Sequence, residues 1–169
     1  MLQRLSRILK HRWVDEADLR QAVPKELVAR LASRVAASER RHSGEVRIYA
    51  EAGLPLSYLW RDAPPRERAV AMFGKLRMWD TEHNNGVLIY LLLAEHAIEI
   101  VADRALSRLV PQAEWDRLAA GMAQAFRESR FEAGLMQAIE GVERHLMQHF
   151  PLAEGAKRAN ELPDAPVVL

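Results

Sequence analysis

NNGVLIYLLLAEHAIEIVADR, residues 84–104, is the stretch of the chain that decides its fold. The unbroken apolar run at 87–94 is typical of a buried strand and is too short to cross a membrane. Residues 97–102 have the pattern of a second strand, with Glu99 as its one polar interior residue. If Glu95 and His96 form a tight turn, the two strands are antiparallel neighbours in a hairpin.

Four polar residues flank the open end of this hairpin. Asn84 and Asn85 precede the first strand, and Asp103 and Arg104 follow the second. Because an antiparallel return brings both ends to the same edge of the sheet, we expect these side chains to lie together. This cluster is the strongest functional signal in the sequence.

A further strand is expected at 45–51, where apolar and polar residues alternate as in a half-exposed strand. A helix at 24–41 precedes it, and a loop at 53–65 follows, with a short edge strand at 56–59. The next helix is expected at 66–81. A strand, a helix and a strand in one sheet normally form a right-handed parallel crossover, so strands 46–50 and 87–94 should be parallel.

Beyond the hairpin, the pattern predicts a short helical turn at 105–110 and two longer helices, the second ending at Pro151. Residues 152–169 show no periodicity and are predicted to be a flexible tail. The expected organisation is therefore a basic helix at 1–14, one α/β domain at 15–151 and the tail.

Composition excludes several classes of protein and site. The chain has 169 residues and no cysteine, which excludes disulfides, thiolate metal ligands and cysteine nucleophiles. A net charge of +1 gives no case for a nucleic-acid partner. Neither a secretory signal nor a stretch of about 20 apolar residues is visible, so we expect a soluble, cytoplasmic protein.

The N-terminal segment is amphipathic and basic. Apolar residues fall on one helical face at Leu2, Leu5, Ile8, Leu9 and Trp13. The segment 1–13 also carries Arg4, Arg7, Lys10 and Arg12 with no acid. Two interpretations stay open: residues 2–13 dock to a partner or peripherally to the inner-membrane surface, or the helix packs on the domain. The second is favoured, with Leu5, Leu9 and Trp13 buried.

The three expected strands place more polar groups at the edge that holds Asn85 and Asp103. Parallel strands begin at the same end of a sheet, so Glu45 should lie level with Asn85, and Asp80 and Thr81 lie in the preceding loop. Two carboxylates held together repel unless a proton, a cation or an arginine lies between them.

Oxygen ligands without cysteine favour Ca²⁺ or Mg²⁺, for which the candidate ligands are Glu45, Asp103 and Asp80. Arg104 or Arg47 could then hold a phosphate by paired hydrogen bonds, beside Asn84, Asn85 and Thr81 as further binding residues. The structural alternative is that Asn-Gly is an ordinary turn and that Asp103 caps the helix that follows it.

The hairpin sequence, with LRMWDT before it and HLMQHFP at the end of the last helix, resembles the TPM domain family over residues 43–151. The family includes thylakoid-lumen proteins linked to photosystem II repair and many small bacterial proteins. The resemblance implies an α/β/α sandwich with a small mixed sheet and an acidic pocket at this end of the sheet. It also implies calcium binding or acid phosphatase activity. Asp103 and Glu45, which the strand ends bring together, are the candidate catalytic carboxylates. Ala105 stands where relatives often carry glycine.

The expected function is thus binding of a divalent cation or a small phosphate-bearing ligand, with weak phosphomonoesterase activity. The alternative is a non-catalytic module that binds a protein partner or a membrane through residues 2–13. Glu143, His145 and His149 form a weaker metal candidate, since only the two histidines have ligand spacing and solvated helix-end histidines are commoner. No serine lies in a nucleophile-elbow context.

Overall fold

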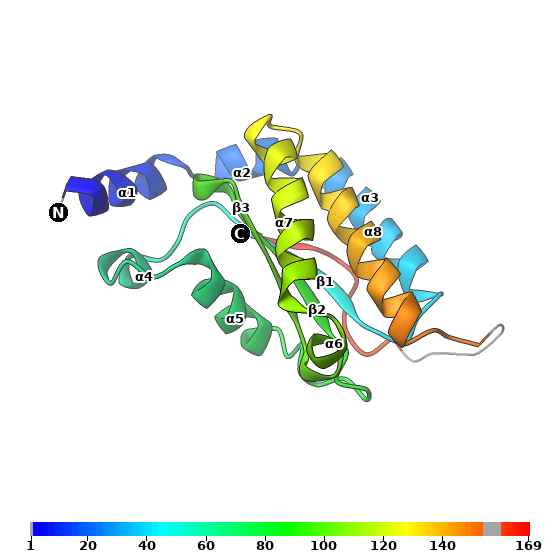
Figure 1. Ribbon diagram of the computed structural model, residues 1–169. Coiled ribbons are helices and arrows are strands. Elements are labelled where there is room, and N and C mark those ends of the chain that lie inside the picture. The colour runs from blue at the N-terminus through cyan, green and yellow to red at the C-terminus, as the bar shows by residue number, and fades with distance from the viewer. Residues whose placement is uncertain (1, 154–159) are drawn as a thin grey trace.

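The computed structural model of the chain describes residues 2–153 and 160–169 and forms a mixed sheet with helices on both faces (Figure 1). Its elements are α1 (Leu2–Trp13), α2 (Glu16–Ala22), α3 (Lys25–Glu39), β1 (Val46–Glu51), α4 (Leu56–Trp60), α5 (Pro65–Lys75), β2 (Val87–Leu92), the 3-10 turn η1 (Leu93–Glu95), β3 (Ala97–Ala102), α6 (Arg104–Leu109), α7 (Gln112–Arg127), α8 (Phe131–His149) and β4 (Val167–Val168).

The sheet has the strand order β3-β2-β1-β4. β2 and β3 are antiparallel and β1 and β2 are parallel, which confirms the predicted hairpin and crossover. The hairpin turn is longer than the predicted Glu95-His96 pair. β2 ends at Leu92, and the chain reverses through η1 and through His96, whose φ of 49° is left-handed.

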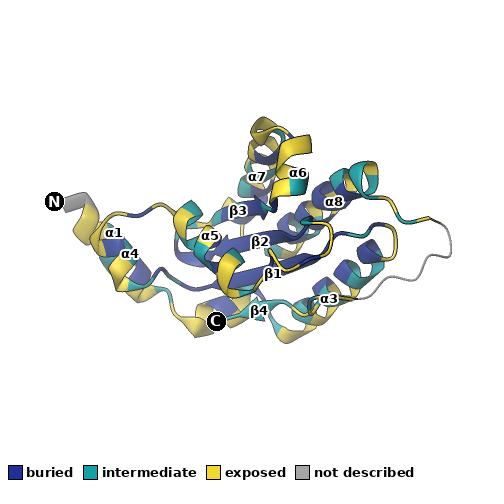
Figure 2. Ribbon diagram, turned by 90° about the horizontal axis from the view of Figure 1, so that it is seen from below, coloured by how far each residue is buried: buried dark blue, intermediate teal, exposed yellow. Residues whose placement is uncertain are grey.

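Each face of the sheet has its own core, and the burial of both is clear in Figure 2. Val46, Ile48 and Ala50 of β1 point to one face, where α2, α3, α6, α7 and α8 pack. Tyr49, Leu88 and other residues of alternate positions point to the opposite face, which α4 and α5 cover. This arrangement confirms the predicted α/β class.

β1 was predicted to be half-exposed, and that prediction is wrong because helices cover both of its faces. Its polar residues Arg47, Tyr49 and Glu51 are all buried. Glu51 accepts two hydrogen bonds from Arg68 of α5, at 2.8 Å from Nε and 2.9 Å from Nη2, and a third from the hydroxyl of Tyr90. A buried carboxylate of this kind is stable only because it is paired.

Two predictions between β1 and β2 are also corrected. The segment expected as an edge strand at 56–59 is helical, and it begins directly after Pro55 at the N-cap, a position where proline's fixed φ suits a helix start. The helix expected at 66–81 ends at Lys75, and turns follow it. Trp79, expected on the buried face of that helix, is therefore half exposed.

The C-terminal segment differs from the predicted flexible tail, part of which, residues 154–159, lies outside the described residues. Val167 and Val168 form β4, which pairs in parallel with β1. The backbone N–H of Leu169 donates to the carbonyl of Ala50 at 2.9 Å, and that of Ala52 donates to the carbonyl of Leu169 at 3.1 Å. A strand of two residues is too short to show the alternation of apolar and polar residues by which strands are predicted from sequence.

The N-terminal helix forms at the predicted residues, but its apolar stripe is not buried. Leu5 is 52% exposed, Leu9 59% and Trp13 83%. The favoured expectation that these residues pack on the domain is therefore wrong. Across the described ranges, none of the helices is both long and apolar enough to span a bilayer.

Candidate functional site

The predicted meeting of three strand ends is present in the backbone. The N–H of Val87 donates to the carbonyl of Glu45 at 2.8 Å, and the N–H of Asp103 donates to the carbonyl of Gly86 at 2.8 Å. These bonds extend the registers of β1 with β2 and of β2 with β3 by one residue. The starts of β1 and β2 and the end of β3 therefore form one edge.

The Asn84-Asn85-Gly86 turn is shaped by its neighbours on the preceding loop. Asn84 has a left-handed φ of 50°, which asparagine tolerates better than most residues. The backbone N–H of Asn85 donates to Oγ1 of Thr81 at 3.2 Å. Gly86 lies so close to Met78 that a Cβ would meet its carbonyl oxygen at 2.2 Å. Glycine is therefore required for this approach of the two backbones.

Asn85 and Asp103 each keep one buried oxygen without a hydrogen-bond partner among the described residues. Asn85 donates through Nδ2 to Oγ of Ser43 at 3.1 Å, which leaves Oδ1 without a donor. Asp103 accepts from the backbone N–H of Arg104 at 2.7 Å through Oδ1, which leaves Oδ2. Such unsatisfied buried acceptors are uncommon in folded proteins, so each of these two oxygens calls for an explanation.

Asp103 takes the capping role that the structural interpretation expects. Its Oδ1 caps α6, and its Oδ2 has no hydrogen-bond partner among the described residues. Arg104 is exposed and donates from Nε and Nη2 to Oδ1 of Asn84, at 3.1 and 3.0 Å. The guanidinium is therefore held beside the Asn84-Asn85-Gly86 turn that precedes β2.

Glu45 lies at the same edge, but its carboxylate binds the C-terminal segment. Oε1 accepts from the backbone N–H of Glu161 at 3.1 Å, and Oε2 accepts from that of Leu162 at 3.3 Å. The side chain is buried. The contact joins residues 117 positions apart, and no sequence pattern signals it. It gives Glu45 a structural role in addition to any role toward a ligand.

Arg47 is the second residue of β1, two positions after Glu45. It is buried, and its Nε donor has no hydrogen-bond partner among the described residues. Burial lowers the pKa of its guanidinium, because the charged form is poorly solvated there. Thr81 is buried next to Asn85, whereas Asp80 is exposed and pairs with Arg77. Asp80 therefore already has a charged partner, unlike the buried Oδ2 of Asp103.

The donor set at this edge consists of oxygens with few carboxylates. Within the described parts of the chain, no group of three or more His, Cys, Asp or Glu side chains is arranged to hold a metal. A cation here would rely on one carboxylate oxygen, one amide oxygen and water or ligand oxygens. Mg²⁺ in particular is often bound through only one or two carboxylates.

The weaker histidine candidate has a structural explanation. The His145 ring packs on Trp115 with the ring centroids 5.0 Å apart, and burial lowers the pKa of the imidazole. Glu143 points instead to Arg34 and Arg41. His96 is exposed in the hairpin turn as expected, at the opposite end of β2 from Asn85.

Comparisons with known proteins agree with this fold. The family profile described as TPM domain matches residues 17–145. The solved structure of the BA42 protein from the psychrophilic bacterium Bizionia argentinensis aligns with a TM-score of 0.71 and 25% sequence identity, covering 84% of this chain and 92% of BA42. None of the curated proteins matches the chain.

Proposed function

Because the chain belongs to the TPM domain family, we propose that the edge bounded by Asn85 and Asp103 binds a divalent cation together with a small phosphate-bearing ligand. The observation that carries this proposal is the pair of unsatisfied buried oxygens, Oδ1 of Asn85 and Oδ2 of Asp103. Asn85 directly precedes Gly86, whose carbonyl accepts the N–H of Asp103, so both residues lie at the same edge of the sheet.

The chemistry of the two oxygens suits a hard cation. An amide oxygen and a carboxylate oxygen are both ligands that Ca²⁺ and Mg²⁺ prefer, and a carboxylate adds the charge that attracts them. Asn85 is oriented by Ser43 and Thr81, and Asp103 by the N-terminus of α6. Both ligands are thus held before any ion arrives, which lowers the entropic cost of binding.

Arg104 is the residue that this proposal assigns to the phosphate. Asn84 holds its guanidinium from one side, and the side chain is exposed, so further N–H groups can donate to phosphoryl oxygens. The buried Nε of Arg47 offers a second donor on β1. A bound cation would polarise a phosphoryl oxygen and lower the pKa of a coordinated water, which is what phosphomonoester hydrolysis requires.

Cation binding is tested by thermal unfolding with excess Ca²⁺, with excess Mg²⁺ and with a chelator. A bound ion stabilises the fold by mass action, by about 2.7 kcal/mol at a concentration of one hundred times Kd. The expected rise in Tm should be lost in Asp103→Asn, which keeps an acceptor for the Arg104 N–H but loses the charge. Asp80→Asn is the matched control and should behave as wild type. Equal Tm in all three conditions would refute the metal proposal.

Hydrolysis is tested with p-nitrophenyl phosphate on the same variants. Turnover should disappear in Asp103→Asn, fall in Arg104→Gln through a higher KM, and persist in Asp80→Asn. A rise in KM indicates lost ground-state binding, as expected for a phosphate-holding residue. Turnover that survives in folded Asp103→Asn would assign the activity to another site or to a contaminant.

A further inference from the structure

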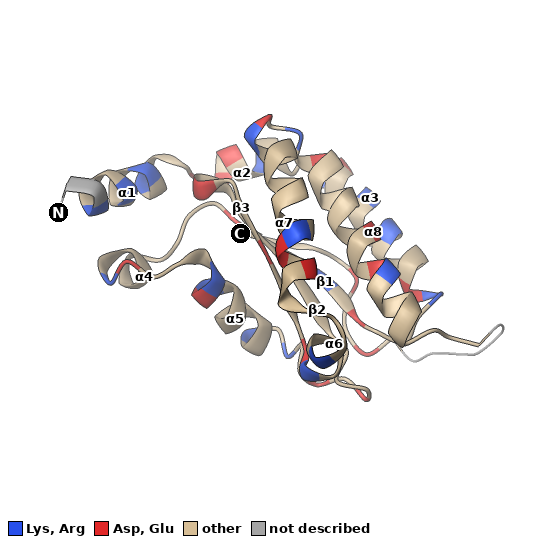
Figure 3. Cartoon of the chain, viewed as in Figure 1, with Lys and Arg blue, Asp and Glu red and all other residues tan. Residues whose placement is uncertain are grey.

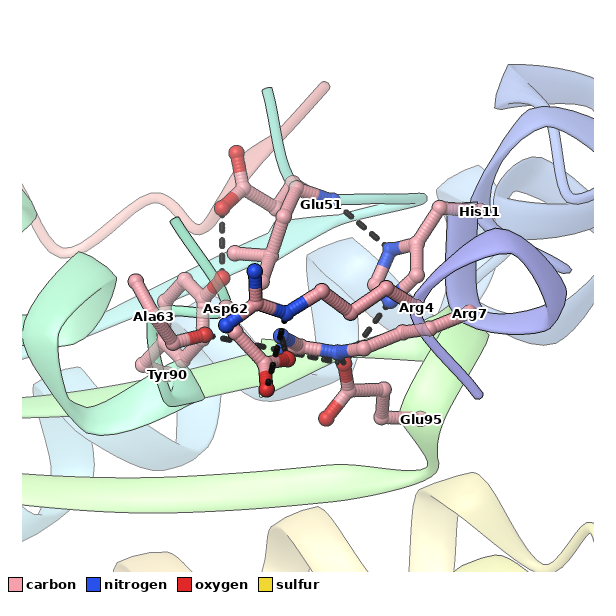
Figure 4. A network of polar contacts seen from close by, with 9 residues as sticks. Arg4, Arg7, His11, Glu51, Asp62, Ala63, Tyr90 and Glu95 are labelled. Carbon is pink, nitrogen blue, oxygen red and sulfur yellow. Dashed lines mark hydrogen bonds and ion pairs between the residues drawn. The ribbon is translucent and has the colours of Figure 1, made fainter. Parts of the chain in front are cut away.

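The side of α1 that faces the domain is polar. Arg7 contacts Glu95 at 2.7 Å through Nη2, donates to Oδ1 of Asp62 at 3.0 Å through Nη1, and donates to the carbonyl of Ala63 at 2.8 Å (Figure 4). His11 is buried beside it. Its Nδ1 accepts from the N–H of Leu54 at 3.0 Å, so Nε2 carries the proton and donates to Glu95 at 2.8 Å.

Glu95 is the centre of this attachment. Burial alone would raise the pKa of its carboxyl, but the hydrogen bonds from His11 and Arg7 outweigh burial and the pKa is lowered. The carboxylate is therefore charged at neutral pH and holds both side chains. Ile8 adds an apolar contact, against the core around α4 and α5. The helix is thus fixed to the domain without its main apolar stripe.

That stripe lies on the opposite side of the helix. Leu5, Leu9 and Trp13 are spaced by four residues, which places them about 40° apart around the axis. All three are more than half exposed, and within the described ranges no other element covers them. A stripe of this kind usually faces a core, so its exposure while the polar side is docked requires an explanation.

Basic residues border the stripe. Lys10 and Arg12 are exposed, and Arg4 is exposed as well but contacts Asp62 at 3.8 Å. α1 contains no acidic residue, and its Lys and Arg residues are blue in Figure 3. A second copy of α1 is a poor occupant for this surface, because antiparallel or parallel pairing would bring like charges together. An anionic surface with an apolar interior complements both the charges and the stripe.

We propose that α1 docks the protein on anionic phospholipid surfaces. Leu5 and Leu9 enter the boundary between headgroups and acyl chains, Trp13 lies at the interface, where indole rings are favoured, and Lys10 and Arg12 contact lipid phosphates. Since Arg7 and His11 keep α1 attached to the domain, the whole molecule is held at the surface. α1 packs on η1 at the C-terminal end of β2, whereas Asn85 precedes its N-terminal end. Six residues of strand separate the two ends by roughly 20 Å.

Vesicle co-sedimentation of the full chain tests this docking. Vesicles of phosphatidylcholine alone are compared with vesicles that contain phosphatidylglycerol in equal amount, at low and high salt. The wild-type chain should bind the anionic vesicles, and less at high salt. The triple variant Leu5→Gln, Leu9→Gln, Trp13→Gln should lose about tenfold or more in binding. The double variant Lys10→Gln, Arg12→Gln should bind anionic vesicles roughly 30-fold more weakly at low salt, because it loses the attraction of two basic residues and about 1.4 kcal/mol corresponds to tenfold in affinity.

Leu109→Gln with Trp79→Gln is the matched control, since both residues are half exposed outside α1. It should bind vesicles as the wild type does, and all variants should melt like the wild type because the altered side chains make no core contact. Equal binding by the triple variant, or equal binding to neutral vesicles, would overturn the proposal. So would a wild-type dimer that the triple variant converts to a monomer, because the occupant would then be a second copy.

Discussion

Gly86 shows how one residue sets the geometry of the candidate site. The carbonyl oxygen of Met78 lies 2.2 Å from where a Cβ would stand, so the loop before β2 packs directly on the turn. This approach positions Asn85 on one side, and the carbonyl of Gly86 accepts the N–H of Asp103 on the other. The backbone arrangement that brings Asn85 and Asp103 to this edge therefore depends on the absence of a side chain at position 86.

We expect Gly86→Ala to lower the free energy of unfolding by about 1–3 kcal/mol, because the obstructing atom belongs to the backbone and cannot rotate away. Gly121→Ala in α7 is the matched control. No atom lies within 4 Å of a Cβ there, and alanine should stabilise the helix by about 0.5–1 kcal/mol. Urea unfolding of both variants provides the measurement. Equal stability of the two would show that the loop before β2 yields easily.

Among the elements, α3 and α8 are joined by a buried carboxylate. Glu143 of α8 contacts Arg34 of α3 through Oε2 and Arg41 through Oε1, the latter at 3.0 Å. Burial alone would raise the pKa of Glu143, but the hydrogen bond from Arg34 and the charges of both arginines outweigh burial and the pKa is lowered. The pairing of these two helices is therefore linked to pH.

A carboxyl whose pKa is lower in the folded than in the unfolded chain adds stability above its ordinary pKa of 4.5, and this stability is lost as pH falls through the folded pKa. We expect the unfolding free energy to decrease below about pH 5, with a shallower decrease in Glu143→Gln. That variant should also lose about 1–2 kcal/mol at neutral pH. Glu16→Gln, from the exposed pair with Arg20, should keep the wild-type slope. Identical slopes for all three proteins would contradict this assignment.

For the molecule as a whole, local patterns were enough to predict the hairpin, the parallel crossover and the class of fold. They could not predict which strand faces are covered. Arg47 and Glu51 suggested solvent, whereas α5 covers that face and supplies Arg68 as a partner for Glu51. The apolar stripe of α1 likewise suggested burial, because nothing in the sequence shows that Glu95 would hold the helix by Arg7 and His11.

The same limit applies to the candidate site. Strand order alone placed the ends of three strands together, and the backbone bonds at Glu45 and Asp103 confirm that arrangement. The orientation of each side chain depends on partners distant in the sequence. Glu45 binds the backbone at 161 and 162, and Asn85 binds Ser43, and neither contact follows from periodicity.

The position of β4 has a consequence for how the chain is made. β1 is synthesised early, whereas β4, which pairs with its outer edge, is synthesised after every other described element. Until then β1 presents unpaired backbone groups, which are a template for intermolecular association. Bringing β4 back to β1 closes a long loop, which costs little additional free energy but slows the pairing of the two strands. The nascent protein is therefore most in need of a chaperone between completion of the β2–β3 hairpin and arrival of Val167 and Val168.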